Sequence, residues 1–100
     1  MESTRTIEDV FRRAIEKYGA NAQKMKAIEE CGELIRAVSR DLQGQKDPEN
    51  IAEEIADVAI MLDQLQEIYR NRETVELIRK LKARRLRYRM KAEKGGGNGL

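Results

Sequence analysis

The sequence predicts an all-α fold of four helices, and three observations support it. Glu, Lys, Arg, Ala and Leu are abundant and one proline occurs in 100 residues, a composition that favours helices over strands. Apolar residues recur at spacings of three and four, as one face of a helix requires. Glycine, or aspartate followed by proline, separates the apolar stretches and marks helix ends. A chain of this length forms one domain, which we expect over residues 1–94, followed by a disordered Gly-rich tail over residues 95–100.

The first helix is expected to begin at Thr6, which can cap its N-terminus with Asp9 at the third position, as in a capping box. Gly19 ends it. Its apolar stripe consists of Val10, Phe11, Ala14, Ile15 and Tyr18. The second helix is expected over residues 21–43, before Gly44, with an apolar stripe that we expect to be buried in the core. That stripe consists of Ile28, Cys31, Ile35, Val38 and Leu42.

The third helix is expected over residues 48–70, because Asp47 is a good N-cap and Pro48 suits the first helical position. Its main stripe consists of Ile51, Ile55, Val58, Leu62, Leu65 and Tyr69. Met61 and Ile68 lie away from this stripe, and a helix that is apolar on two sides packs on more than one neighbour. Few aromatic residues leave the core aliphatic and thin, so we also expect a second copy to cover part of it. The fourth helix is expected over residues 73–92.

The composition excludes several kinds of site. The chain has no histidine and one cysteine, which excludes histidine catalysis, an internal disulfide and a paired-cysteine zinc site. No apolar run is long enough to span a membrane, and the N-terminus lacks the apolar core of a signal peptide, so we expect a cytoplasmic protein. Residues 79–94 hold nine basic groups and one acidic group, whereas the rest of the chain holds 11 basic and 17 acidic groups. A basic segment of this kind fits a phosphorylated ligand, a nucleic acid or a solvated helix.

The second and third helices each carry a pair of carboxylates at positions i and i+3. Glu30 and Glu33 lie on the second helix, and Glu54 and Asp57 lie on the third. This spacing places both members of a pair on one side of the helix, within one turn and next to its apolar stripe. The short connection predicts that the two helices are antiparallel neighbours. In that arrangement we expect the four carboxylates to converge at a partly buried place.

Carboxylates held together in this way repel one another unless a cation compensates their charge. Oxygen ligands without histidine or thiolate favour Mg²⁺ or Mn²⁺ over zinc or copper. A ferritin-like di-iron site needs Glu-x-x-His pairs, which this chain cannot form, and the calcium-loop pattern is missing. The alternative is a solvated acidic face, because Glu pairs are common on helices. Two such pairs beside the core on consecutive helices favour the metal site.

The segments that hold these carboxylates resemble a known family. Their sequences are AIEECGELI over residues 27–35 and AEEIADV over residues 52–58. They are similar to the motifs of MazG-like nucleoside triphosphate pyrophosphohydrolases, which belong to the all-α NTP pyrophosphatase superfamily together with dimeric dUTPases and phosphoribosyl-ATP pyrophosphohydrolase. The resemblance covers about residues 23–90. It implies a four-helix MazG-like bundle completed by oligomerisation, as a homodimer or homotetramer, with Mg²⁺ as the cofactor and Mn²⁺ as a possible substitute.

The resemblance also implies roles for individual residues. Metal ligation falls to Glu30, Glu33, Glu54 and Asp57. Glu29 and Glu53 become candidate catalytic groups, which bind a second metal or accept a proton from water. Gln23 becomes a candidate for contacting the nucleoside. Three basic residues that share a face of the fourth helix become candidates for binding the substrate phosphates: Lys82, Arg85 and Arg89.

These implications point to Mg²⁺-dependent hydrolysis of a nucleoside triphosphate to a monophosphate and pyrophosphate. No candidate for a covalent nucleophile is present, which favours direct attack by water. One alternative is a phosphoribosyl-ATP pyrophosphohydrolase. Another is a non-catalytic helical interaction module, stabilised by metal or bound to nucleic acid. Nucleic acid fits less well as a partner, because Tyr88 is the only aromatic residue in the basic segment and the acidic middle of the chain would repel a phosphate backbone.

Overall fold

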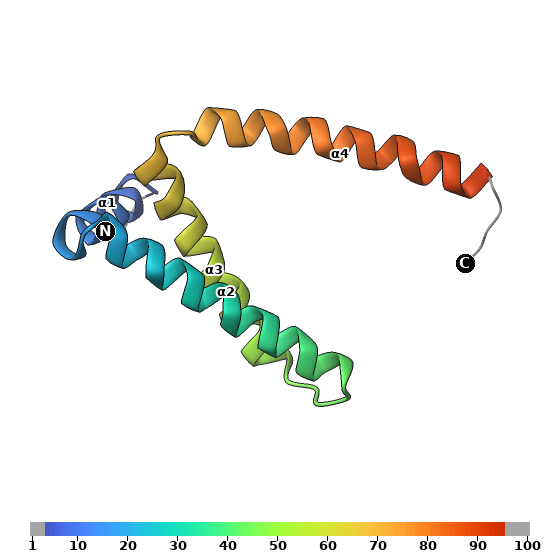
Figure 1. The fold of residues 1–100 in the computed structure, drawn as a ribbon, viewed down its shortest axis with the longest axis horizontal. Helices are drawn as coiled ribbons and strands as arrows, with labels where there is room; N and C mark the ends of the chain where they lie inside the picture. The colour runs from blue at the N-terminus through green and yellow to red at the C-terminus, as the bar shows by residue number, and fades with distance from the viewer. Residues whose placement is uncertain (1–3, 96–100) are drawn as a thin grey trace. The chain divides into compact units, whose positions relative to one another are not determined.

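The computed structural model of the chain describes residues 4–95, with side chains from residue 7 to residue 93. The described part consists of four α-helices: α1 (Thr4–Tyr18), α2 (Ala20–Leu42), α3 (Pro48–Tyr69) and α4 (Arg72–Gly95) (Figure 1). The predicted all-α fold with four helices is therefore confirmed. The predicted disordered tail lies outside the described residues, except for Gly95, which is the last residue of α4.

The helices fall into two units, residues 1–70 and residues 71–100. In the first unit, α2 and α3 form the most extensive contact, and α1 contacts both of them. Figure 1 shows α2 and α3 side by side, joined by a tight turn, so that they run in opposite directions. The antiparallel arrangement that the short connection predicts is confirmed for this pair.

The ends of the helices follow local sequence signals, with one exception. Asp47 caps α3, because its Oδ1 accepts a hydrogen bond from the backbone N–H of Asn50 at 3.1 Å. Gly19 separates α1 from α2 with a φ of +94°, a left-handed conformation that glycine adopts without steric cost. The exception is Thr6. Because α1 begins at Thr4, Thr6 lies inside the helix and the predicted capping box is wrong.

The face of α2 that packs on α3 differs from the predicted one. Ala27 and Ala37 are buried on this face, and Leu34 between them is half-buried. Small side chains at a contact allow two helices to approach closely. The predicted core stripe of α2 is exposed instead: Ile28, Cys31, Ile35, Val38 and Leu42. The prediction that this stripe forms the core is therefore wrong for the described chain.

The packed face of α3 coincides only in part with the predicted main stripe. Met61 and Gln64, which lie outside that stripe, are buried. Half of the stripe is half-buried (Ile51, Val58 and Leu65), and the other half is exposed (Ile55, Leu62 and Tyr69). In both helices the exposed residues of the predicted stripes lie to one side of the packed face, as the helical period requires. Because the two helices are antiparallel, these exposed stripes fall on the same side of the α2–α3 hairpin. We call this surface the apolar side.

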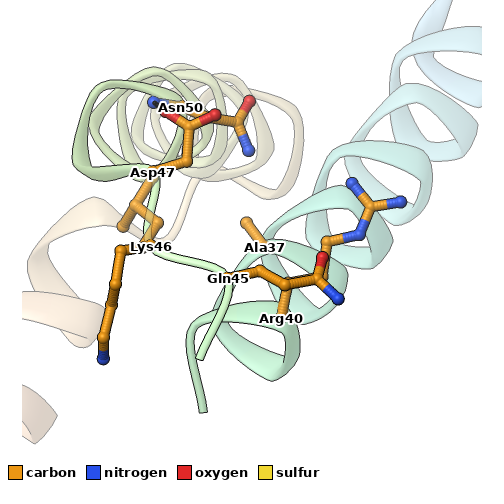
Figure 2. Close-up of a pocket in the computed structure, with 7 residues that line it drawn as sticks. Ala37, Arg40, Gln45, Lys46, Asp47 and Asn50 are labelled. Carbon is orange, nitrogen blue, oxygen red and sulfur yellow. Dashed lines mark hydrogen bonds between the residues drawn. The ribbon is translucent and has the colours of Figure 1, made fainter. Parts of the chain in front are cut away.

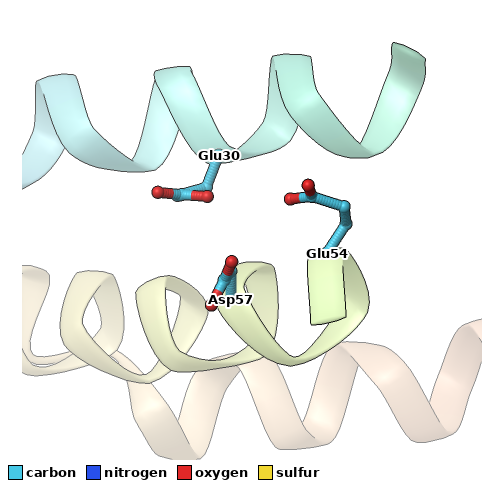
Figure 3. A group of neighbouring side chains, drawn as sticks. All are labelled: Glu30, Glu54 and Asp57. Atoms are coloured by element: carbon cyan, nitrogen blue, oxygen red, sulfur yellow. The ribbon is translucent and has the colours of Figure 1, made fainter. Parts of the chain in front are cut away.

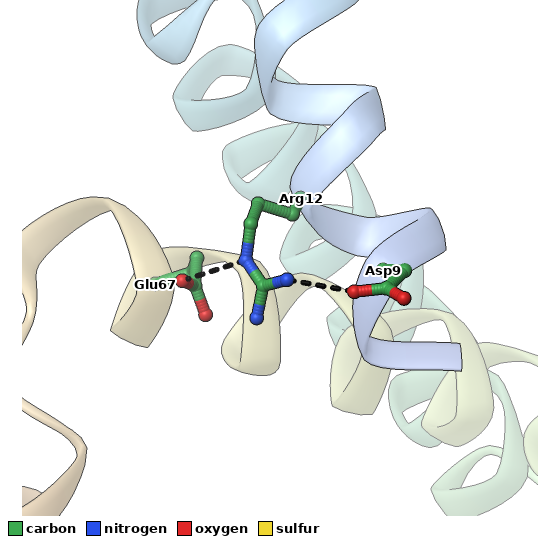
Figure 4. A network of polar contacts seen from close by, with 3 residues as sticks. All are labelled: Asp9, Arg12 and Glu67. Atoms are coloured by element: carbon green, nitrogen blue, oxygen red, sulfur yellow. Dashed lines mark hydrogen bonds and ion pairs between the residues drawn. The ribbon is translucent and has the colours of Figure 1, made fainter. Parts of the chain in front are cut away.

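A polar network joins α1 to α3. The Arg12 guanidinium donates a hydrogen bond through Nη1 to Asp9 Oδ1 at 2.7 Å and through Nε to Glu67 Oε2 at 3.4 Å (Figure 4). The hydrogen bond and charge of Glu67, and then those of Asp9, raise the pKa of Arg12. Asp9 therefore supports the packing of α1 through this arginine.

The second unit consists of α4. Every side chain from Glu76 to Glu93 is exposed, including six large apolar ones. They are Leu77, Ile78, Leu81, Leu86, Tyr88 and Met90. Among the described residues, no helix combines the length and the apolar composition that a membrane span requires.

Candidate active site

Three of the four predicted metal ligands meet between α2 and α3. Glu30 extends from α2 toward α3, and Glu54 and Asp57 extend from α3 (Figure 3). One carboxylate oxygen from each of the three lies within 4.8 Å of the others. Glu30 and Glu54 are half-buried and Asp57 is exposed. We call these three residues the carboxylate cluster.

The carboxylate cluster follows from the packing of the α2–α3 hairpin. Ala27 and Leu34 flank Glu30 on the packed face of α2, each about one turn away. Glu54 and Asp57 are one turn apart on α3. By the helical period Glu30 and Glu54 fall on the packed faces of their helices, beside the buried residues Ala27 and Met61. The carboxylate cluster therefore lies at the contact between α2 and α3, whereas the apolar side lies to one side of this contact.

The remaining predicted carboxylates lie near the cluster but outside it. Glu33 is exposed and is not among the three residues that meet within 4.8 Å, although its charge acts on Glu54. Glu29 and Glu53 are also exposed, next to Glu30 and Glu54 in the sequence. Their predicted roles, as a fourth ligand and as catalytic groups, stay predictions.

The surroundings of Glu54 disfavour its charged form. Partial burial is the largest cause, followed by the negative charges of Glu33, Asp57, Glu30 and Glu53, and all of these raise the pKa of Glu54. A carboxylate in such a place is stabilised by a proton or by a nearby cation. The electrostatics of the carboxylate cluster therefore favour the binding of a positive ion.

One cation of the chain itself already reaches the carboxylate cluster, and the sequence analysis overlooks it. Lys26 Nζ lies 3.2 Å from Glu30 Oε2 and 3.8 Å from Glu29 Oε1. Its hydrogen bond to Glu30 is the main cause that raises the pKa of Lys26, followed by the charges of Glu29, Glu30 and Asp57. The spacing of four residues between Lys26 and Glu30 is the sequence signal that could have identified this contact.

A pair of amides lies next to the carboxylate cluster along the hairpin. Gln23 Nε2 donates a hydrogen bond to Gln64 Oε1 at 2.8 Å, and Gln64 is only 5% exposed. Gln23 lies seven residues before Glu30, and Gln64 lies seven residues after Asp57. Because seven residues are two helical turns, this symmetry could have identified Gln64 from the sequence. The nucleoside contact predicted for Gln23 stays a prediction.

The predicted phosphate-binding residues belong to the second unit. Lys82, Arg85 and Arg89 are exposed, and their spacings of three and four residues place them on one face of α4. Exposure leaves their charged groups accessible to an anion.

A small pocket of about 210 Å³ lies where α2 ends and α3 begins (Figure 2). Its lining includes Arg40, Lys46 and the capping residue Asp47. None of the sequence-predicted site residues lines it. The pocket is therefore distinct from the carboxylate cluster.

Comparison with protein families supports the interpretation of this cluster. The family model of the MazG nucleotide pyrophosphohydrolase domain matches residues 20–85. The chain belongs to this family. The matched MazG domain begins at the first residue of α2, includes the whole carboxylate cluster and ends within α4 at Arg85, so that Arg89 lies beyond it. Searches of curated proteins and of solved structures found no match.

The donor set of this MazG domain fits a hard divalent cation. Mg²⁺ and Mn²⁺ prefer oxygen ligands, and Mg²⁺ is usually held by a few carboxylates together with waters and substrate phosphates. The carboxylate cluster offers three such groups, one of which is exposed and leaves one side of the site open. Membership of a nucleotide pyrophosphohydrolase family and an acidic cluster that can hold a metal are therefore consistent with each other.

The raised pKa of Glu54 predicts how the metal-free protein responds to pH. Because Glu54 binds a proton more tightly in the folded state than in the unfolded state, protonation of Glu54 stabilises the fold at low pH, and this stabilisation is lost as pH rises. An amide at this position does not ionise, so the free energy of unfolding no longer falls with rising pH on account of this residue. We therefore expect Glu54→Gln to have a higher free energy of unfolding than the wild type at about pH 7 and a similar one at about pH 4. Urea unfolding in EDTA, followed by circular dichroism, measures the difference.

The control for this experiment is Glu76→Gln, which removes an exposed carboxylate from α4. It should leave the pH dependence of the unfolding free energy unchanged. A Glu54→Gln protein that is no more stable than the wild type at neutral pH would show that the carboxylate cluster is not under electrostatic strain.

Proposed function

We propose that this MazG domain catalyses the Mg²⁺-dependent hydrolysis of a ribo- or deoxyribonucleoside triphosphate to the monophosphate and pyrophosphate. The observation that carries the proposal is the meeting of Glu30, Glu54 and Asp57 within 4.8 Å, inside a segment that matches a nucleotide pyrophosphohydrolase family. A metal-stabilised module without catalytic activity would hold the same carboxylates, so the family match is the observation that favours an enzyme over such a module.

We assign different roles in this reaction to different carboxylates of the chain. Glu30, Glu54 and Asp57 would hold the cation, with Glu33 as a further ligand. Mg²⁺ held there would supply positive charge that polarises the phosphate and makes the attacking water more acidic. Glu29 or Glu53 accepts the proton of the attacking water. The water oxygen bonds to phosphorus, the α–β anhydride bond breaks, and pyrophosphate leaves.

Basic and amide groups bind the two ends of the substrate. A triphosphate carries about four negative charges, more than one divalent cation neutralises. Lys82, Arg85 and Arg89 supply the remaining positive charge, because arginine can grip phosphate oxygens with two parallel hydrogen bonds. Gln23 contacts the nucleoside, supported by its hydrogen bond to Gln64.

The proposed active form is a homodimer or homotetramer. The apolar side of the hairpin leaves bulky residues in water, with Ile28 at 73%, Ile35 at 66% and Leu62 at 47% exposure. Burial of apolar surface contributes about 25 cal/mol per Å², and contiguous exposed apolar surface of this kind is typical of protein interfaces. We expect a second copy of the chain to cover this side.

The first prediction from this proposal concerns the metal. EDTA should abolish pyrophosphate release from nucleoside triphosphates, and Mg²⁺ or Mn²⁺ should restore it. Glu54→Gln keeps the shape of the side chain but removes a ligand charge, so we expect turnover to fall at least about a hundredfold. Pyrophosphate release from a panel of nucleotides, including phosphoribosyl-ATP, measures both effects and distinguishes the substrate classes.

Glu76→Gln again serves as the control and should keep wild-type turnover. Circular dichroism establishes that both variants are folded. Wild-type activity in Glu54→Gln would refute the assignment of this residue as a ligand.

The second prediction separates phosphate binding from nucleic-acid binding. Arg85→Ala should reduce triphosphate hydrolysis by about tenfold or more, since a charge-assisted contact to phosphate is lost. Arg87→Ala should have little effect, because an exposed charge on another face contributes only a screened field. Steady-state kinetics at one ionic strength measures this difference. Equal losses of oligonucleotide affinity in both variants, without hydrolysis by the wild type, would favour a nucleic-acid-binding protein.

The third prediction concerns assembly. Sedimentation equilibrium at micromolar concentration should show a dimer or tetramer of the 11.5 kDa chain. Ile35→Glu places a charge on the apolar side and should shift the equilibrium toward monomer. Arg36→Glu places the same side chain on a different face of α2 and should not. A wild-type protein that sediments as a monomer would contradict the proposed interface.

A further inference from the structure

The contact between Lys26 and Glu30 joins an exposed residue to a half-buried one. The side chain of Glu30 is 14% exposed, whereas that of Lys26 is 51% exposed, and the two are 3.2 Å apart. Among residues 7–93, no other cation lies within 4 Å of a carboxylate of the cluster. Lys26 is therefore the counter-ion that the described chain supplies to Glu30.

This ion pair differs from an ordinary surface pair on a helix. A lysine four residues before a glutamate is the less favourable of the two orientations in an isolated helix, and exposed pairs contribute little. Here Glu30 faces α3 and has lost most of its contact with water, and two further carboxylates lie within 4.8 Å of it. The pair is better explained by the charge of the carboxylate cluster than by the stability of α2.

We propose that Lys26 has two successive partners, Glu30 while no cation is bound and a substrate phosphate once the cation is in place. The inference rests on the proposed function, and it assigns to this MazG domain a phosphate-binding residue on α2. Lys26 lies one helical turn from Glu30, so its ammonium stays beside the carboxylate cluster in either state.

The physical reason for the exchange is a competition between two positive charges. A divalent cation that binds the Glu30 carboxylate takes over the role of counter-ion and repels an ammonium at the same carboxylate. Lysine has a flexible four-carbon stem, and the half-exposed side chain of Lys26 is free to turn outward. An incoming triphosphate offers the next negative charge at this place.

Calorimetric titration with Mn²⁺, in the absence of nucleotide, tests the first half of the exchange. Lys26→Met removes the competing charge, so we expect it to bind Mn²⁺ about fivefold more tightly than the wild type. Lys26→Arg keeps the charge and should bind like the wild type. Lys24→Met is the matched control, because Lys24 lies on the same helix but over the Tyr69 ring at 4.6 Å. It should change the Mn²⁺ affinity by less than about twofold.

Titration of the Mn²⁺-saturated proteins with tripolyphosphate tests the second half. Lys26→Met should bind this probe about tenfold more weakly than the wild type, because a charge-assisted contact is lost. Lys24→Met should bind it like the wild type. The same substitution thus tightens one ligand and weakens the other, which a general loss of structure does not produce.

Three results would overturn the inference. Weaker Mn²⁺ binding in Lys26→Met would show that Lys26 orients Glu30 as a ligand. Equal behaviour of Lys26→Met and Lys24→Met would show that only overall charge matters, and unchanged tripolyphosphate affinity would exclude the phosphate contact. Absence of Mn²⁺ binding in the wild type would instead refute the proposed function, and this inference with it.

Discussion

Electrostatic repulsion among Glu30, Glu54 and Asp57 is the constraint on which the rest of the molecule depends. Oxygens of three carboxylates meet within 4.8 Å, and two of the residues are half-buried. Partial burial, followed by the negative charges of Glu33 and of the cluster, raises the pKa of Glu54. The fold tolerates this arrangement because α2 and α3 pack through small and aliphatic side chains on either side of it. The negative charge of these carboxylates favours the binding of a divalent cation.

The α2–α3 hairpin carries two distinct features, the carboxylate cluster and the apolar side. The carboxylate cluster lies at the contact between the helices, and the exposed residues of the apolar side, such as Ile35 and Leu62, lie to one side of that contact. The same antiparallel packing of α2 on α3 that brings the carboxylates together also aligns the two apolar stripes. It therefore determines the position of both the carboxylate cluster and the apolar side.

Polar groups extend the site along α2 in a regular order. Gln23, Lys26 and Glu30 follow one another at about one-turn spacing on α2. Gln23 donates a hydrogen bond to Gln64, Lys26 forms an ion pair with Glu30, and Glu30 lies near the carboxylates of α3. A substrate with a nucleoside at one end and phosphates at the other presents groups that these side chains can bind in the same order. Amides suit a base or sugar, an ammonium suits a phosphate, and carboxylates suit the metal that the phosphate shares.

The sequence by itself determined the four helices, the cap at Asp47 and the identity of the acidic motifs, because capping and i, i+3 spacing are local properties. It did not determine which face of each helix meets its neighbour. The stripe of α2 with the largest apolar side chains is exposed, and the alanine face is packed. Periodicity gives the order of side chains around one helix, but the rotation of that helix against another depends on how both surfaces fit. For this reason only the tertiary structure revealed which residues are packed and that Glu33 lies outside the cluster, whereas the contact of Lys26 with Glu30 follows from a local i, i+4 spacing.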